Sequence, residues 1–250
     1  MKTLAFINRK GGVSKTTSAL AFAAYLAQHD KKVLALDMDA QSNFTTSSGG
    51  ERDVKGVLDF LMGEPLSEVL QTSTGGYDFI GADRRLSKAD DALPRIGREF
   101  VLRQALENID DYDFVVIDTP PAMETLTLAA MVSADEIIIP CRNDSYTIDG
   151  LSELRGNLDA VRKCYNQKLK VAGLLRTYYK SRAKISQSLD PVLEQAAAAM
   201  NTKVFSATIR EDTKLKEAEM MQQDIYSYAP TSHGAEDYAA AAEEFLREAD

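Results

Sequence analysis

The sequence predicts a single α/β domain built on one twisted, mainly parallel β-sheet with helices on both faces. Three observations lead to this fold class. Short apolar segments alternate with helical segments along the chain, as in repeated βαβ units. The apolar segments lack polar alternation, which is typical of strands that are buried on both faces. The 250 residues contain no internal repeat and no low-complexity linker, so we interpret residues 1–250 as one domain.

Each apolar run is expected to form a strand of this sheet. The expected strands are residues 3–8, 32–36, 77–80, 114–117, 136–140, 170–176 and 203–205. The segments between them and after them are expected to form helices, which are short where Gly, Ser and Thr interrupt the chain. The expected helices are residues 16–29, 57–62, 67–71, 96–109, 123–132, 146–164, 184–200, 213–220 and 235–248.

Composition excludes several classes of protein. No apolar run reaches the roughly 18 residues that span a bilayer, and the N-terminus lacks the apolar core and cleavage site of a signal peptide. Cys141 and Cys164 are too few for a disulfide framework or a structural zinc site, so we expect a cytoplasmic protein with reduced thiols. The net charge of −9 argues against coating nucleic acid with the whole surface, although a local basic patch stays possible.

A glycine-rich loop at residues 9–17 follows the first expected strand and leads into a helix. Gly11 and Gly12 let backbone N–H groups approach phosphate oxygens without an intervening Cβ. The start of the following helix adds about half a positive charge. Lys15 supplies a point charge for the β and γ phosphates, and the Thr16 hydroxyl is placed to ligate Mg²⁺. The loop therefore predicts a site for ATP and Mg²⁺.

This loop departs from the ordinary Walker A pattern G-x-x-x-x-G-K-[ST]. Arg9 and Ser14 stand at its two glycine positions, and a second lysine, Lys10, precedes the glycines. A serine held at positive φ would cost about 1–2 kcal/mol. We expect the backbone at Ser14 to lie in an allowed region, so that the substitution is tolerated.

The pattern K-G-G-x-x-K-T-[ST] after the first strand resembles the deviant Walker A box of the ParA/MinD group of P-loop ATPases. Other segments resemble ParA segments in the same order, with Ala40 in place of a usual proline. They are residues 36–43 (D-x-D-P-Q-x-N), 115–121 (the Walker B strand), 173–177 (a late strand and a base-contacting position), 208–210, 217–218 and 228–230. The resemblance covers nearly the whole chain. It implies a single-domain P-loop NTPase fold and a partition ATPase of the ParA/Soj type.

The resemblance implies that Lys10 reaches across a dimer interface to the partner's nucleotide, so that ATP joins two subunits. Asp118, at the end of an apolar strand, is expected to hold Mg²⁺ through water. Asp39 is expected to orient the attacking water, and Asp37 to support the metal shell. The expected catalytic residues are Lys10, Lys15 and Asp39. The expected nucleotide-binding residues are Lys10, Gly11, Gly12, Val13, Ser14, Lys15, Thr16, Thr17, Thr177, Ile209 and Arg210. The expected metal-binding residues are Thr16, Asp39 and Asp118.

Basic residues are concentrated late in the chain. Residues 160–220 contain 12 Lys and Arg against 6 Asp and Glu, although the whole chain is acidic. Such a block is typical either of a partner-facing surface or of solvated helix faces. In a ParA-like protein it would bind DNA nonspecifically through phosphate contacts. The candidate contacts are Arg182, Lys184, Lys203, Arg210, Lys214 and Lys216.

The expected function is an Mg·ATP-dependent partition ATPase that dimerises on ATP, binds DNA nonspecifically and segregates a plasmid or chromosome with a ParB-like adaptor protein. This implies a cytoplasmic, nucleoid-associated protein without a separate N-terminal DNA-binding domain. Alternatives are a ParA-like ATPase that positions a protein cargo, a MinD-like membrane-cycling ATPase, a metal-cluster relative and a metabolic P-loop enzyme. The acidic end of the chain, residues 242–250, disfavours membrane binding, and two separated cysteines disfavour a bridging cluster.

Overall fold

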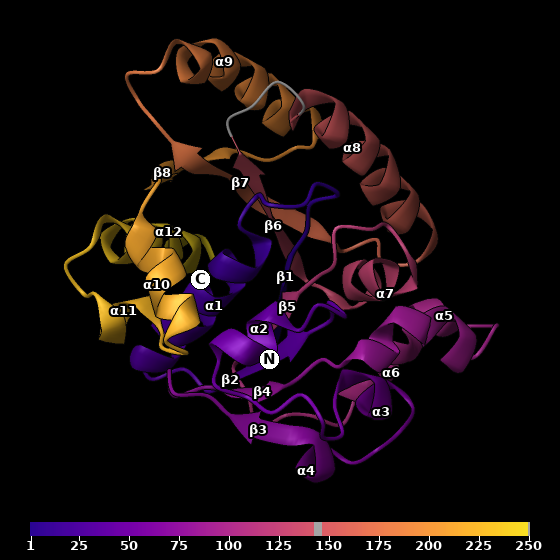
Figure 1. The fold of residues 1–250 in the computed structure, drawn as a ribbon. Helices are drawn as coiled ribbons and strands as arrows, with labels where there is room; N and C mark the ends of the chain where they lie inside the picture. Colours follow the sequence, from indigo (N-terminus) through magenta and orange to yellow (C-terminus); the bar gives the residue numbers. More distant parts are fainter. Residues whose placement is uncertain (143–146, 250) are drawn as a thin grey trace.

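The structure, a computed structural model, describes residues 1–142 and 147–249. The described residues form an eight-stranded sheet in the order β3-β4-β2-β5-β1-β6-β7-β8, with helices on both faces (Figure 1). Neighbouring strands are parallel except β3 and β4. The strands are β1 (Lys2–Phe6), β2 (Val33–Asp37), β3 (Leu70–Thr72), β4 (Asp78–Ile80), β5 (Phe114–Asp118), β6 (Glu136–Arg142), β7 (Lys170–Tyr179) and β8 (Val204–Arg210). The predicted single-domain α/β fold is confirmed.

The helices of the described residues fall into a longer and a shorter group. The longer ones are α1 (Lys15–Gln28), α7 (Thr125–Ser133), α8 (Thr147–Cys164), α9 (Lys184–Ala199), α10 (Thr213–Met220) and α12 (His233–Ala249). The shorter ones are α2 (Asn43–Ser47), α3 (Val57–Leu61), α4 (Leu66–Val69), α5 (Ala89–Ala92), α6 (Val101–Leu106), α11 (Ile225–Tyr228) and the 3₁₀ helices η1 (Arg84–Lys88) and η2 (Arg98–Phe100).

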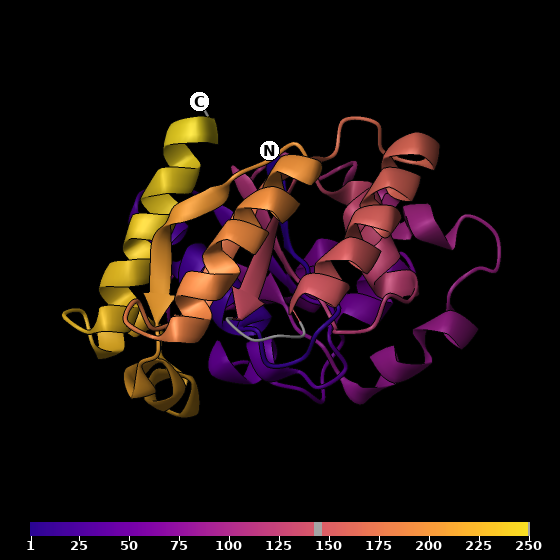
Figure 2. The ribbon, with the colours of Figure 1, turned by 90° about the horizontal axis from the view of Figure 1, so that it is seen from above.

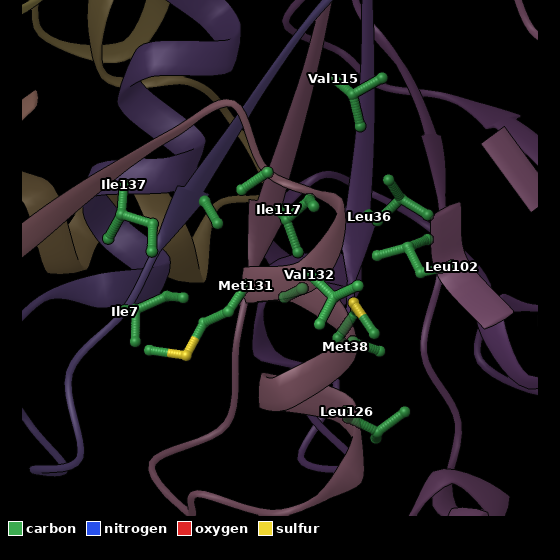
Figure 3. Close-up of a cluster of buried hydrophobic side chains, with 14 of the residues drawn as sticks. Ile7, Leu36, Met38, Leu102, Val115, Ile117, Leu126, Met131, Val132 and Ile137 are labelled. Carbon is green, nitrogen blue, oxygen red and sulfur yellow. The ribbon is translucent and has the colours of Figure 1, made fainter. Parts of the chain in front are cut away.

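The sheet separates two hydrophobic cores, because successive strand residues point to opposite faces. Leu34 and Leu36 of β2 belong to the core beneath α3, α6, α7 and α8, whereas Val33 and Ala35 belong to the core beneath α1 and α12. Figure 3 shows part of the first core, where Ile117 of β5 lies near Met131 and other residues of α7. Both faces of the central strands are therefore buried, as their continuous apolar sequences predict.

Several predicted boundaries differ from the structure. Residues 67–71, expected to be one helix, divide between α4 and the antiparallel edge strand β3. The strand expected at 203–205 continues to Arg210, and the helix expected at 96–109 contains η2 and the shorter α6. Residue 146, the first of the helix expected at 146–164, lies outside the described residues.

The ends of the central strands bring the predicted functional segments to one edge. β1 lies between β5 and β6. The strands β2 to β5 lie on one side of β1, and the later strands β6 to β8 lie on its other side. Ligands of open α/β sheets bind at such a switch point. Asp37 and Asp118 end neighbouring strands and are register partners. In Figure 2 the arrowheads of the visible strands point to the same side of the molecule. Within the described ranges, no helix has the length and apolarity needed to cross a membrane.

Candidate functional site

The loop after β1 ends in a helix N-terminus with open amide groups. Gly12 has φ 72°, and Ser14, the residue before α1, has φ 68° and ψ 32°. The first helical hydrogen bond of α1 runs from Ser18 N–H to the Ser14 carbonyl at 2.9 Å. The amides of Lys15, Thr16 and Thr17 precede it and have no partner inside the helix. These amides, with the helix dipole behind them, favour an anion.

The backbone at Ser14 corrects one expectation. We expected an ordinary allowed conformation there, but the residue lies in the left-handed region that favours glycine. Such a conformation costs a non-glycine residue about 1–2 kcal/mol. The requirement for positive φ explains why the ordinary loop pattern has glycine at this position, and the serine retains the turn in a strained form.

Lys15 lies inside the loop with its ammonium group close to the backbone. Its side chain is buried, and Nζ donates to the Lys10 carbonyl oxygen at 3.1 Å. Burial lowers the pKa of Lys15, while the nearby carboxylates of Asp118 and Asp39 oppose that shift. A cation is thus held where the loop amides and the ends of β2 and β5 converge, which suits the binding of a phosphate group.

Thr16 and Asp118 form the contact that joins α1 to the end of β5. Thr16 Oγ1 donates to Asp118 Oδ2 at 2.7 Å, and Asp118 is completely buried. Its second oxygen, Oδ1, accepts no hydrogen bond from any described residue. Burial raises the pKa of Asp118 well above its usual value, and the charge of Asp37 adds to this shift.

A buried carboxylate with an unpartnered oxygen beside a threonine hydroxyl fits Mg²⁺, which prefers oxygen ligands. The described part of the chain contains no group of three or more His, Cys, Asp or Glu side chains that could hold a metal. An ion at Thr16 and Asp118 would therefore take its other ligands from water or phosphate, as Mg²⁺ usually does.

Asp37 and Asp39 have different surroundings although they are two residues apart. Asp37 is fully buried, and its carboxylate accepts hydrogen bonds from the Thr45 amide, the Thr45 hydroxyl and the Asp39 amide. Burial raises the pKa of Asp37 to about 6, against these hydrogen bonds. Asp39 is half-buried and accepts a hydrogen bond from the Gln41 amide. The Asp37 carboxylate is therefore engaged in holding the loop after β2. Asp39, which lies near Lys15, is more available to contact a bound ligand.

A small pocket lies on the other side of the loop, toward β8 and α10. Its volume is about 100 Å³, and its lining includes Ser14, Thr17, Ile209, Arg210 and Glu219. Thr177 lies close by, because its hydroxyl donates to the Val13 carbonyl oxygen at 3.2 Å. The predicted nucleotide-binding residues of β7 and β8 thus lie beside the loop.

Lys10 is half-buried, and its backbone N–H donates to Asn8 Oδ1 at 3.0 Å. Asn8 Nδ2 in turn donates to the Pro140 carbonyl oxygen at 2.7 Å, which ties the start of the loop to β6. Arg9 forms an ion pair with Glu153 of α8. The two residues before the glycines are thus anchored to β6 and α8.

The six basic candidates for DNA contact fall into two groups. Three form ion pairs: Lys203 with Glu244 and Glu248, Arg210 with Asp237 and Glu236, and Lys214 with Glu217. Arg182, Lys184 and Lys216 are exposed and form no ion pair with any described residue. The positive charges of these three residues are therefore more available to contact DNA phosphates.

Sequence reasoning missed two residues of the site. Thr45 satisfies the buried Asp37 carboxylate, and Glu219 of α10 accepts a hydrogen bond from the Thr17 hydroxyl at 2.6 Å. Thr17 and Glu219 are separated by 202 positions in the sequence, so no local pattern could have connected them.

The chain is similar to known proteins along nearly its whole length. A family model described as an AAA domain matches residues 1–171. The chromosome-partitioning ATPase Soj of Thermus thermophilus is 36% identical over 98% of this chain and 96% of its own length. The sporulation initiation inhibitor protein Soj of Bacillus subtilis is 34% identical over 97% of each chain.

Solved structures show the same fold. The cobyrinic acid a,c-diamide synthase of Mycobacterium smegmatis, solved with an ATP analogue and magnesium, is 30% identical and superposes with a TM-score of 0.85 over 99% of this chain and 95% of that one. These ligands are consistent with a requirement for ATP and Mg²⁺ here. From its full-length similarity to the two Soj proteins and its matching fold, the chain belongs to the ParA/Soj family of P-loop ATPases.

Proposed function

We propose that this chain is a partition ATPase that dimerises when Mg·ATP occupies the loop at residues 9–17 and then binds DNA without sequence preference. One observation carries the nucleotide site: Thr16 donates to the buried Asp118, whose Oδ1 has no partner among the described residues. An adaptor protein like ParB would stimulate hydrolysis and release the DNA. Two full-length relatives named Soj, one of them called a chromosome-partitioning ATPase, support the partition role.

The proposed roles follow from where negative charge accumulates during phosphoryl transfer. The loop amides and the Lys15 ammonium bind the phosphates, and Thr16 and Asp118 hold Mg²⁺. Bound Mg²⁺ supplies positive charge that offsets the charge on the phosphate oxygens. Asp39 orients the attacking water, since its carboxylate is near Lys15 and half-buried. Lys10 contacts the partner subunit's nucleotide, so dimerisation requires ATP.

DNA binding is proposed to depend mainly on Arg182, Lys184 and Lys216, which form no ion pair with a described residue. Ion-paired Arg210 and Lys214 would have to exchange a carboxylate for a DNA phosphate, which reduces their contribution. Nucleoid association follows from this binding. The same cycle would carry either DNA or a protein assembly as cargo, and the adaptor protein decides between them.

A membrane-cycling role is disfavoured by the packing of α12. Its Tyr238, Ala241 and Phe245 are buried in the core shared with α1, so its apolar face already has a partner. An interfacial helix needs that face for lipid. Acidic Glu243, with its neighbours along α12, would also be repelled by anionic lipid.

The test is DNA retention on a sensor with ATP, with ADP and without nucleotide, each with Mg²⁺. We expect retention with ATP alone, and a steep loss of affinity as salt increases. Retention that is independent of ATP, or insensitive to salt, would contradict the proposed output. Retention on anionic vesicles instead would favour the membrane-cycling alternative.

A further inference from the structure

The hydrogen bond between Thr17 and Glu219 joins the phosphate-binding end of α1 to α10. Thr17 Oγ1 donates to Glu219 Oε1 at 2.6 Å. Glu219 lies in the last turn of α10, and both residues line the pocket beside the loop. A carboxylate is thus fixed next to an element whose amides and dipole favour an anion.

α10 packs on the core beneath α1 and α12 through a narrow face, where Leu215 is partly buried beside Ala218. Within its eight residues, all described, Ala218 is the one that is buried. Thr213, Lys214, Lys216 and Met220 are exposed, and Met220 is 83% exposed. Alongside this packing, the hydrogen bond from Thr17 ties the last turn of α10 to the phosphate-binding end of α1.

The carboxylate of Glu219 occupies an unfavourable electrostatic position for a nucleotide site. Burial raises the pKa of Glu219, and Lys216, one turn earlier, is the positive charge that opposes this shift. A phosphate on the Thr17 amide would bring a second negative charge within several ångströms of the carboxylate. In a partly buried site such repulsion is weakly screened.

From this geometry we infer that Glu219 is a nucleotide-sensing residue. Phosphate binding at the start of α1 repels its carboxylate, breaks the contact with Thr17 and loosens α10. This inference rests on the proposed nucleotide site. Because α10 carries Lys214 and Lys216, nucleotide binding would also change how these two DNA-contact candidates are presented.

Glu219→Gln removes the negative charge but keeps the hydrogen bond, since the amide oxygen can still accept from the Thr17 hydroxyl. Isothermal titration with Mg·ADP should give about tenfold tighter binding to the variant than to the unaltered chain, because the repulsion is removed. The control is Glu217→Gln, which removes the same charge from the same helix but pairs with Lys214 and Tyr228 away from the loop. Its affinity should stay within about twofold of the unaltered chain.

Hydrogen exchange reports the movement of α10 directly. Mg·ADP should speed exchange of the amides of residues 213–220 in the unaltered chain but not in Glu219→Gln. Equal affinity and equal exchange in the two proteins would overturn the sensing role and leave the nucleotide site intact. Weaker binding by the variant would instead assign Glu219 a purely supporting role. Failure of the unaltered chain to bind Mg·ADP would overturn the nucleotide site itself.

Discussion

Replacing Asp118 by asparagine should make the nucleotide-free protein more stable while weakening its response to Mg²⁺. Asp118 is completely buried, and its register partner Asp37 is a second buried carboxylate. Its Oδ1 accepts no hydrogen bond from a described residue. The desolvation cost of such an unsatisfied group is about 1–3 kcal/mol, and larger when it is charged. Asparagine removes the charge and keeps an oxygen for Thr16.

The expected gain can be converted to a melting temperature. For a chain of this size, 1 kcal/mol shifts the melting temperature by about 2–4 °C. Allowing for an imperfectly satisfied asparagine amide, we expect a gain of about 1 kcal/mol, and hence a melting temperature higher by about 2–4 °C without Mg²⁺ and nucleotide. Calorimetry of the metal-free protein is the assay. Asp111→Asn, at an exposed position ahead of β5, is the matched control and should change stability by less than about 0.5 kcal/mol.

When Mg·ADP is added, the unaltered chain should have a higher melting temperature than Asp118→Asn, which reverses the order expected without ligand. Mg·ADP at about 100 times its dissociation constant stabilises the unaltered chain by about 2.7 kcal/mol, or about 5–11 °C. In Asp118→Asn the increment from Mg²⁺ over ADP alone should disappear. A lower melting temperature for the metal-free variant, or an undiminished Mg²⁺ increment, would contradict the role assigned to Asp118.

Four other variants test the remaining roles. Lys15→Ala should abolish ATP binding, because the loop loses its buried cation; full turnover in an ATPase assay would contradict the site. Lys10→Ala should still bind nucleotide but remain monomeric with ATP, and an unchanged sedimentation profile would reject its action across the interface. Asp39→Ala should accumulate an ATP-bound dimer, whereas normal hydrolysis would exclude water positioning. Lys184→Glu combined with Lys216→Glu should lower DNA affinity at least tenfold at physiological salt, since each contact is electrostatic; unaltered retention on the DNA sensor would move the interface elsewhere.

The fold was largely predictable because each central strand is a continuous run of apolar residues in the sequence. The apolar side chains of residues 114–117 would be exposed to water at the edge of a sheet. In the structure they are buried, because β5 lies between β1 and β2. The edge strand β3 was missed because Leu70–Thr72 directly continues the short helix α4, and three residues carry no period. The extension of β8 was missed because exposed Ser206 and half-buried Thr208 interrupt its apolar pattern.

The candidate site was predictable only where it is local in the sequence. The loop residues follow one another, so their chemistry could be recognised before the fold was known. The ion pairs that engage Arg210 and Lys203 with α12 depend on how that helix packs against β8, which no local pattern reveals. The left-handed conformation of Ser14 likewise depends on how the loop closes onto α1.

The most direct test of the nucleotide site is a crystal structure of the chain with Mg²⁺ and a non-hydrolysable ATP analogue. We expect the β and γ phosphates on the amides of the loop, with the Lys15 ammonium against them and the ion beside Thr16 and Asp118. Phosphates bound at any other place, with the loop still closed by its own hydrogen bonds, would contradict this expectation.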